Sequence, residues 1–182
     1  SPDLDAIYVT GANELHAEHV VMAADHKKQI IVEKPIALSL AECDAMLAAV
    51  NRSGVRLLAG HTHAFDVPNK AMAELVLSGR YGPLVMMNSW YFTDWLRRPR
   101  VPDDFDAKKG GGVLFRQGPH HVGLARMVGG GLVKSVRGHT SVVSPDRPVE
   151  ASYSASISFE GGAVAHLSFS GYGYFNSGAL NW

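Results

Sequence analysis

The chain has 182 residues, of which 46% are hydrophobic, a proportion typical of folded globular proteins. Its 17 Lys and Arg residues balance 17 Asp and Glu residues, so we predict that it binds neither nucleic acid nor an anionic membrane surface. The single cysteine, Cys43, excludes an internal disulfide, and no apolar run reaches the roughly 20 residues that span a bilayer, which together predict a cytoplasmic protein.

The first 60 residues alternate between short apolar runs and segments of helical periodicity. Ser39 is a predicted helix N-cap, Glu42 completes a capping box with it, and Gly54 ends the same helix. The predicted elements, in order, are a strand at Ala6 to Val9, a helix at Leu15 to Ala24, a strand at Ile30 to Val32, the helix after Ser39 and a strand at Val55 to Ala59. This order is typical of a parallel sheet covered by helices.

Residues 61–182 have a different pattern and predict a second domain, for substrate binding and oligomerisation. The predicted elements are a helix at Asn69 to Ser78, a strand at Leu84 to Phe92, a loop at Thr93 to Lys109, a helix from the Gly110 to Gly112 turn to about Val128, and strands at Val133 to Val143, Ala151 to Phe159 and Val164 to Ser170. We therefore predict an α/β fold in which residues 1–60 form part of a Rossmann-type parallel sheet. An α+β domain with a mostly antiparallel open sheet follows, and both domains are expected to be incomplete.

Two turns follow predicted parallel strands, at the edge where open α/β sheets bind their ligands. The first, Thr10 to Asn13, has small and polar residues that allow a ligand close to the backbone. Alternatively, it is an ordinary turn in which Asn13 caps the next helix.

The second turn, Glu33 to Pro35, holds Lys34 between an apolar strand and a proline. Desolvation there would favour a neutral amine, which can exchange a proton with a substrate hydroxyl. The alternative is a surface lysine beside a helix entry.

Nine histidines are present, several of them in close pairs. His16 and His19 share a helix face, but no Asp, Glu or Cys stands at a spacing that completes a site with them, so we predict no metal. His120 follows the triple glycine, which permits close approach of other atoms, and is a candidate general acid or base. The alternative is a buried histidine that bonds to the backbone.

Arginines are the notable cations of the second half, and their planar guanidinium groups match carboxylates. The candidates are Arg97, Arg98, Arg100 and Arg116. One interpretation is a dianionic substrate. For the first three the alternative is a solvated charged face.

Three motifs in order, Thr10 to His16, Glu33 to Pro35 and Gly110 to His120, resemble the Gfo/Idh/MocA family of glucose-fructose oxidoreductases and inositol dehydrogenases. The resemblance covers nearly the whole chain. It implies an NAD or NADP cofactor and catalytic roles for Lys34 and His120. The residues that it implies for cofactor binding are Thr10, Asn13, His16, Glu33 and Lys34.

The chain departs from the family pattern beside the histidine, where Arg116 and Gly123 stand at positions that are often aspartate. Ala64 replaces a usual arginine in the run Gly60 to Asp66. This run and the segment Thr93 to Arg100 resemble the branch that contains dihydrodiol phthalate dehydrogenases. That branch implies substrate binding by His63, Trp90, Arg97, Arg98 and Arg116.

The predicted activity is that of an NAD(P)-dependent dehydrogenase, which transfers a hydride between a CH-OH group of a small polar or cyclic substrate and a nicotinamide cofactor. A dihydrodihydroxyphthalate-type diol is one such substrate. The alternatives are a sugar or cyclitol dehydrogenase and a non-catalytic binding or assembly protein of the same fold.

No GxGxxG motif precedes a helix, so we expect the phosphate-binding turn upstream of Ser1. We therefore expect the piece alone to bind the cofactor poorly and to have little activity. The C-terminal strands predict a homo-oligomer.

Overall fold

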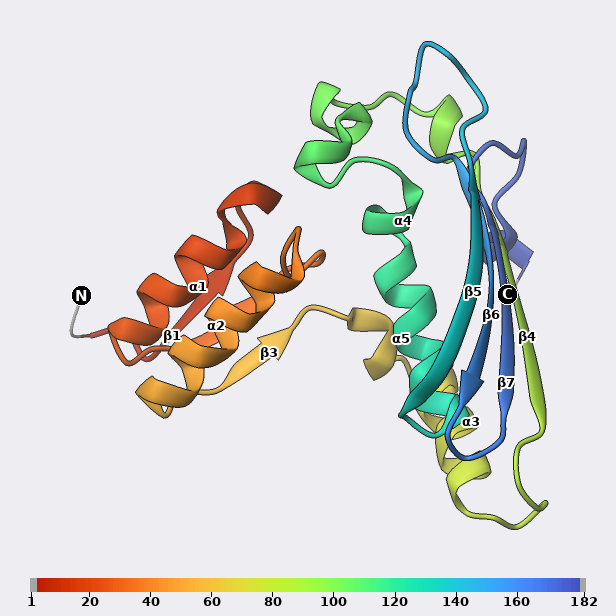
Figure 1. The fold of residues 1–182 in the computed structure, drawn as a ribbon, viewed down its shortest axis with the longest axis horizontal. Coiled ribbons are helices and arrows are strands. Elements are labelled where there is room, and N and C mark those ends of the chain that lie inside the picture. Colours follow the sequence, from red (N-terminus) through yellow and green to blue (C-terminus); the bar gives the residue numbers. More distant parts are fainter. Residues whose placement is uncertain (1–2, 181–182) are drawn as a thin grey trace. The chain divides into compact units, whose positions relative to one another are not determined.

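The computed structural model describes residues 3–180 of the chain. They form two compact units, whose elements are labelled in Figure 1. The first unit comprises the residues up to His61 together with Lys108–Gly110, and the second comprises Thr62–Ala107 and the residues from Gly111 onward. Within residues 3–180, no helix combines the length and the apolar character needed to cross a membrane.

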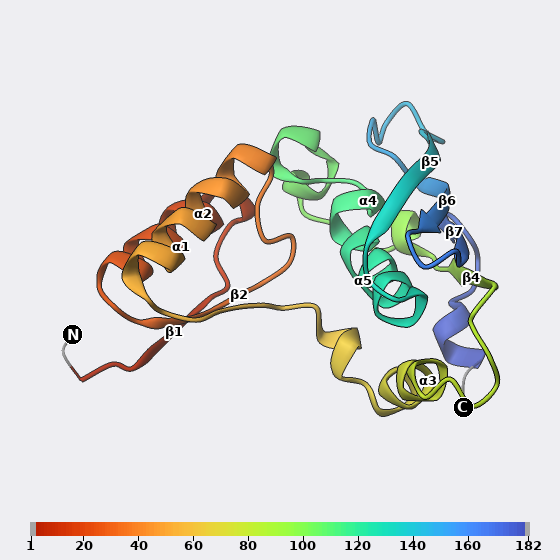
Figure 2. The ribbon, with the colours of Figure 1, turned by 60° about the horizontal axis from the view of Figure 1, so that its bottom comes forward.

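The first unit is a three-stranded parallel sheet with two helices. Its elements are β1 (Ala6–Val9), α1 (His16–Asp25), β2 (Gln29–Val32), α2 (Leu40–Ser53) and β3 (Leu57–Ala59), with a 3-10 turn at Asn13–Leu15. The strand order is β1-β2-β3, and α1 and α2 pack side by side on one face of the sheet (Figure 2). Buried Val20, Ile30 and Met46 bring both helices and the central strand into one core. The predicted Rossmann-type sheet is confirmed.

The ends of α2 follow the sequence signals, with one difference. The Ser39 hydroxyl accepts a hydrogen bond from the Glu42 backbone N–H at 3.2 Å, as a helix N-cap does. Gly54 ends the helix with a left-handed φ of 69°, which costs glycine little because it has no Cβ. The Glu42 carboxylate, however, accepts its bond from the Leu38 N–H at 2.7 Å, and not from Ser39 as a capping box requires.

The second unit is a mixed four-stranded sheet covered on one face by helix α5. Its elements are α3 (Val67–Leu77), β4 (Met86–Phe92), α4 (Val113–Arg116), α5 (Gly118–Gly129), β5 (Val133–Ser141), β6 (Ser152–Phe159) and β7 (Val164–Ser170). Four 3-10 turns complete it, at Thr62–Phe65, Trp95–Arg97, Pro102–Phe105 and Ser177–Leu180. A further 3-10 turn, Ala107–Lys109, leads from Ala107 of this unit into the Lys108–Gly110 segment of the first unit. Figure 1 shows α5 lying along one face of the sheet. Ile157 and Leu167 of the sheet pack in one core with Ala125 of α5.

The strand order of this sheet is β4-β7-β6-β5. β5, β6 and β7 form the predicted antiparallel meander, whereas β4 pairs in parallel with β7. The α+β domain is therefore confirmed, with a sheet that is antiparallel in two of its three strand pairs. Parallel pairing is possible here because the long connection through α4, α5, β5 and β6 separates β4 from β7 along the chain.

The helix predicted after the triple glycine is broken at Gln117, whose φ of −120° separates α4 from α5. Glu150 holds the first turn of α4 in place. Its backbone carbonyl accepts a hydrogen bond from the Val113 N–H at 3.0 Å, and its carboxylate accepts one from the Leu114 N–H at 3.2 Å. Gly112 has a φ of 89°, and a Cβ on it would lie 2.6 Å from the Glu150 carboxylate. Only glycine fits at this position without displacing the carboxylate that holds the helix start.

Candidate functional site

The carboxyl ends of β1 and β2 form one edge of the first sheet, because the strands are parallel and Val9 is in register with Val32. Thr10 is exposed at the end of β1, and Glu33 and Lys34 are half-buried at the end of β2. The Glu33 carboxylate accepts hydrogen bonds from the Tyr8 hydroxyl at 2.5 Å and from the Lys34 backbone N–H at 3.0 Å. The bond to Glu33 raises the pKa of Tyr8. Both predicted cofactor turns thus lie at the same edge.

His16 supports these two turns from within the unit. Its side chain is buried, with Nδ1 2.8 Å from the Pro35 carbonyl oxygen and Nε2 3.2 Å from that of Gly11. The imidazole therefore links the turn after β1 to the turn after β2. Direct contact between His16 and a cofactor stays a prediction, and the observed contacts give the residue a supporting position.

Asn13 does not cap the helix that follows β1. The residue at the N-cap of that 3-10 turn is Ala12, and no side chain bonds to the helix start there. The Asn13 amide instead donates to the Lys109 carbonyl at 2.8 Å, within the same unit. The N-cap alternative for Asn13 is therefore wrong, because its amide is committed to a residue 96 positions away.

In the second unit, α5 carries His120 in its first turn, where it meets His63. The two imidazole rings meet edge to face with centroids 4.6 Å apart and an interplanar angle of 68°. His63 Nδ1 lies 2.7 Å from an oxygen of Asp66, and Asn69 donates to the His63 carbonyl at 2.8 Å. The structure thus aligns Asp66, His63 and His120, of which the sequence analysis selected only the two histidines.

The next residue, His121, has a different role from His120. It is buried, with Nδ1 2.9 Å from the Tyr153 hydroxyl of β6 and Nε2 2.7 Å from the Ser89 hydroxyl of β4. Burial lowers the pKa of His121 from 6.5 to about 4 and raises the pKa of Tyr153. His121 is therefore a neutral anchor between α5 and the sheet.

Within the described part of the chain, no group of three or more His, Cys, Asp or Glu residues is placed to hold a metal.

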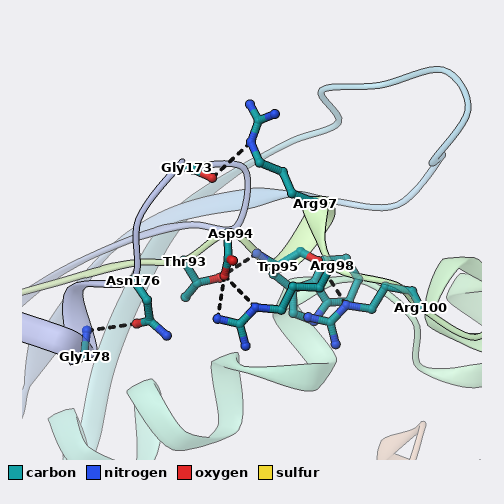
Figure 3. Close-up of polar contacts among 9 residues, drawn as sticks. All are labelled: Thr93, Asp94, Trp95, Arg97, Arg98, Arg100, Gly173, Asn176 and Gly178. Carbon is teal, nitrogen blue, oxygen red and sulfur yellow. Dashed lines mark hydrogen bonds and ion pairs between the residues drawn. The ribbon is translucent and has the colours of Figure 1, made fainter.

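Three of the predicted carboxylate-binding arginines have protein partners. Arg97 donates from Nε to the Gly173 carbonyl at 3.1 Å (Figure 3). Its guanidinium also lies over the Tyr174 ring, with Cζ 3.5 Å from the centroid. Arg98 pairs with Asp94 at 2.6 Å. In the same unit, Arg116 pairs with Asp104 at 2.9 Å, and both side chains are largely shielded from solvent.

Trp90 is not brought together with His120. Successive side chains of a strand point to opposite faces of the sheet, and Ser89 of β4 points to the face where it bonds to His121 of α5. Trp90 therefore lies on the other face, where 69% of its surface is exposed. The predicted substrate contact of Trp90 would have to be made on that face.

Comparison with known protein families assigns both parts of the chain. Residues 1–61 match the family model described as oxidoreductase family, NAD-binding Rossmann fold. Residues 69–179 match the model of the GFO/IDH/MocA C-terminal domain. Together these matches cover both units, so the parallel sheet of the first unit is of the NAD-binding type.

Individual relatives agree with the family models. The chain is 37% identical over 177 residues to a 1-carboxy-3-chloro-3,4-dihydroxycyclo hexa-1,5-diene dehydrogenase of Comamonas testosteroni, which covers 97% of this chain and 45% of that protein. It is 28% identical to a scyllo-inositol 2-dehydrogenase (NAD(+)) of Bacillus subtilis, covering 79% of this chain and 40% of the relative. The crystal structure of a putative dehydrogenase from Bordetella bronchiseptica superposes with a TM-score of 0.92 at 38% identity, covering 97% of this chain and 46% of that one.

The chain therefore spans somewhat less than half the length of these relatives. The family models nevertheless account for nearly all of the described residues, in the order that the three sequence motifs predict. The chain belongs to the Gfo/Idh/MocA family of NAD-binding oxidoreductases.

Proposed function

We propose that this chain supplies the catalytic residues of an NAD(P)-dependent dehydrogenase that oxidises or forms a CH-OH group on a small cyclic substrate. The observation that carries the proposal is the position of Lys34, half-buried at the carboxyl end of β2 and next to the exposed Thr10 turn of β1. Ligands of open α/β sheets bind at this edge. A lysine at this point is within reach of a cofactor and of the substrate beside it.

The residues at this edge fit a nicotinamide cofactor. Thr10, Gly11 and Ala12 are exposed, so their backbone is accessible to a ligand, and the nearest atoms to a Cβ built on Gly11 are 3.8 Å away. Thr10, Asn13, Glu33 and Lys34 would hold the cofactor, with His16 supporting both turns. When bound, the cofactor supplies the acceptor or donor of the hydride.

Proton transfer is the task of the chain's own side chains. We assign Lys34 to the substrate hydroxyl, whose proton it accepts during oxidation, and His120 to the exchange of that proton with solvent. The Asp66 carboxylate holds the Nδ1 side of His63, and His63 in turn contacts His120. This contact would fix the orientation of the His120 ring although Arg116 and Gly123 replace the aspartates common in the family.

A carboxylated cyclic diol is the substrate class that we favour. The relative with 37% identity is named for a carboxylated dihydroxycyclohexadiene, and arginines gather in the loop between β4 and α4 of the second unit. His63 and the arginines Arg97, Arg98 and Arg116 are the proposed substrate contacts. A cyclitol or sugar is the alternative, supported by the similarity to a scyllo-inositol dehydrogenase.

We also propose that the protein is a homo-oligomer that associates through the outer face of the four-stranded sheet. Met86 and Trp90 of β4 are large apolar side chains on that face, with 55% and 69% of their surfaces exposed. Exposed apolar side chains on a sheet face are typical of an interface between copies. The molecular mass measured by sedimentation would be that of a monomer if this proposal were wrong.

Replacement of Lys34 by alanine in the full-length protein tests the proposed reaction. We expect Lys34→Ala to lower kcat for a carboxylated cyclic diol by at least about 100-fold, because general base catalysis contributes that much or more. The measurement is the rate at which the absorbance of the reduced cofactor rises, in separate assays at saturating NAD and at saturating NADP. Lys28→Ala is the matched control, because Lys28 is also half-buried but precedes the amino end of β2, where it bonds to the Leu4 carbonyl, and it should leave kcat unchanged. Full activity of Lys34→Ala would remove Lys34 from the mechanism.

A further inference from the structure

Arg100 is held in place by a buried aromatic residue of the second unit. Its guanidinium lies over the Trp95 indole, with Cζ 4.5 Å from the ring centroid, and its Nε donates to the Trp95 carbonyl at 3.0 Å (Figure 3). Trp95 is only 4% exposed and packs edge-on against Phe105, with ring centroids 6.0 Å apart. The stacking and the hydrogen bond fix the position of a side chain that would otherwise be flexible.

The charges around Arg100 do not balance. Burial lowers the pKa of Arg100, the positive charges of Arg98 and Arg116 act in the same direction, and Asp104 and Asp94 oppose them. Arg98 is paired with Asp94 and Arg116 with Asp104. Among these five charged groups, both carboxylates are thus paired with the other two arginines, and Arg100 is the guanidinium without an ion pair. An arginine keeps its proton under such conditions, so an anion is the remaining means of compensation.

The terminal nitrogens of Arg100 are the free part of this cluster. Across residues 3–180, the contacts of Arg100 are its Nε bond and its stacking on Trp95, which leave Nη1 and Nη2 without a hydrogen-bond acceptor or ion-pair partner. Arg97 differs, since its guanidinium is stacked on Tyr174 at the exposed surface and bonds to Gly173. A half-buried guanidinium whose two terminal NH2 groups are both free is suited to bind one carboxylate in a bidentate manner.

We propose that Arg100 binds the single carboxylate of the substrate, whereas Arg98 and Arg116, whose charges are already paired with Asp94 and Asp104, would contact other groups of the substrate. The subsite belongs to the same unit as His120, the proposed acid or base. This inference rests on the proposed function for the identity of the ligand as a substrate. It narrows the substrate class to monocarboxylates, since one positive charge is left to compensate.

Binding of simple aromatic acids to the full-length protein tests the subsite without any turnover. Isothermal titration at saturating NAD would use benzoate as a monocarboxylate, phthalate as a dicarboxylate and benzyl alcohol as a neutral ring. We expect Arg100→Gln to weaken benzoate by at least about tenfold, the loss of one charge-assisted hydrogen bond, and to leave benzyl alcohol unchanged. Arg100→Lys, which keeps the charge without the fork, should fall between the wild type and Arg100→Gln. Arg80→Gln is the control, because Arg80 also lies over an aromatic ring, that of exposed Tyr81, but has no part in the proposed site, and it should change benzoate binding less than twofold.

Two results would overturn the inference. Equal benzoate affinity in the wild type and both Arg100 variants would remove Arg100 from the site, and phthalate binding more than tenfold tighter than benzoate would exclude a single-carboxylate site. Cofactor reduction is measured separately. If the protein binds benzoate through Arg100 but oxidises no alcohol, the anion site stands and the proposed dehydrogenase function is wrong. If it oxidises the carboxylated diol and Arg100→Gln does so equally well, the dehydrogenase function stands and Arg100 does not bind the substrate.

Discussion

At the scale of single residues, the alignment of Asp66, His63 and His120 is the contact that most affects the proposed chemistry. His63 and His120 were selected from the sequence, His120 because it follows a triple glycine and His63 because of the family resemblance. Asp66 was not selected, although it ends the same run of residues. Its carboxylate reaches His63 because Thr62–Phe65 forms a 3-10 turn, and the sequence around that turn does not predict one.

Asp66→Asn should slow the reaction without weakening substrate binding. The amide no longer offers a negative charge to His63, so the ring that contacts His120 is less firmly oriented, and we expect kcat to fall about tenfold while KM changes less than twofold. Steady-state kinetics of the full-length protein measure both constants. Asp66→Glu, which keeps the charge, should recover part of kcat. A change in KM alone would show that Asp66 acts on binding and not on the histidines.

At the scale of elements, helix α5 is fastened to the sheet by His121, which bonds to Ser89 of β4 and Tyr153 of β6. The sequence predicted the helix and these strands but not the contact between them. It connects a helix residue to two strands that are not neighbours in the sheet, and this depends on the strand order β4-β7-β6-β5. Periodicity along one element does not contain that information.

His121 makes the stability of the second unit depend on pH. Its pKa is lowered in the folded state from 6.5 to about 4, so between these values the unfolded chain binds more protons than the folded one. The free energy of unfolding should therefore rise from pH 4 to pH 6.5, by up to about 1.4 kcal/mol per pH unit from this group, and its contribution should be constant above pH 6.5. Urea unfolding followed by tryptophan fluorescence measures this slope. His121→Gln should reduce the slope, and an identical slope in this variant would contradict the assignment.

The start of α4 gives a second prediction at this scale. Gly112→Ala places a Cβ 2.6 Å from the Glu150 carboxylate at a residue whose φ is 89°, so we expect a loss of about 2 kcal/mol in the free energy of unfolding. Gly161→Ala is the matched control, because a Cβ there meets no atom within 4 Å and φ is not left-handed. Its free energy of unfolding should stay within about 0.5 kcal/mol of the wild type. Equal losses in the two variants would exclude a special role for the contact with Glu150.

At the scale of the whole molecule, sequence patterns predicted each unit's class and left the strand pairing of the second unit incomplete. The βαβαβ order of the first unit fixes its topology, because parallel strands joined by short helices have few alternatives. In the second unit, turn signals such as Glu160 to Gly162 predicted the meander of β5, β6 and β7. The parallel pairing of β4 with β7 joins segments about 80 residues apart and is not indicated by any local pattern.

The central proposal is that Lys34 and His120 both take part in moving the proton of the substrate hydroxyl. A double-mutant cycle with Lys34→Ala, His120→Gln and both changes, read as kcat/KM for a carboxylated cyclic diol in the full-length protein, tests it most directly. Residues that act as one unit are non-additive, so we predict that the double variant is no slower than the slower single variant. Losses that multiply in the double variant would show that the two residues act independently, and that result would contradict a shared role in proton transfer.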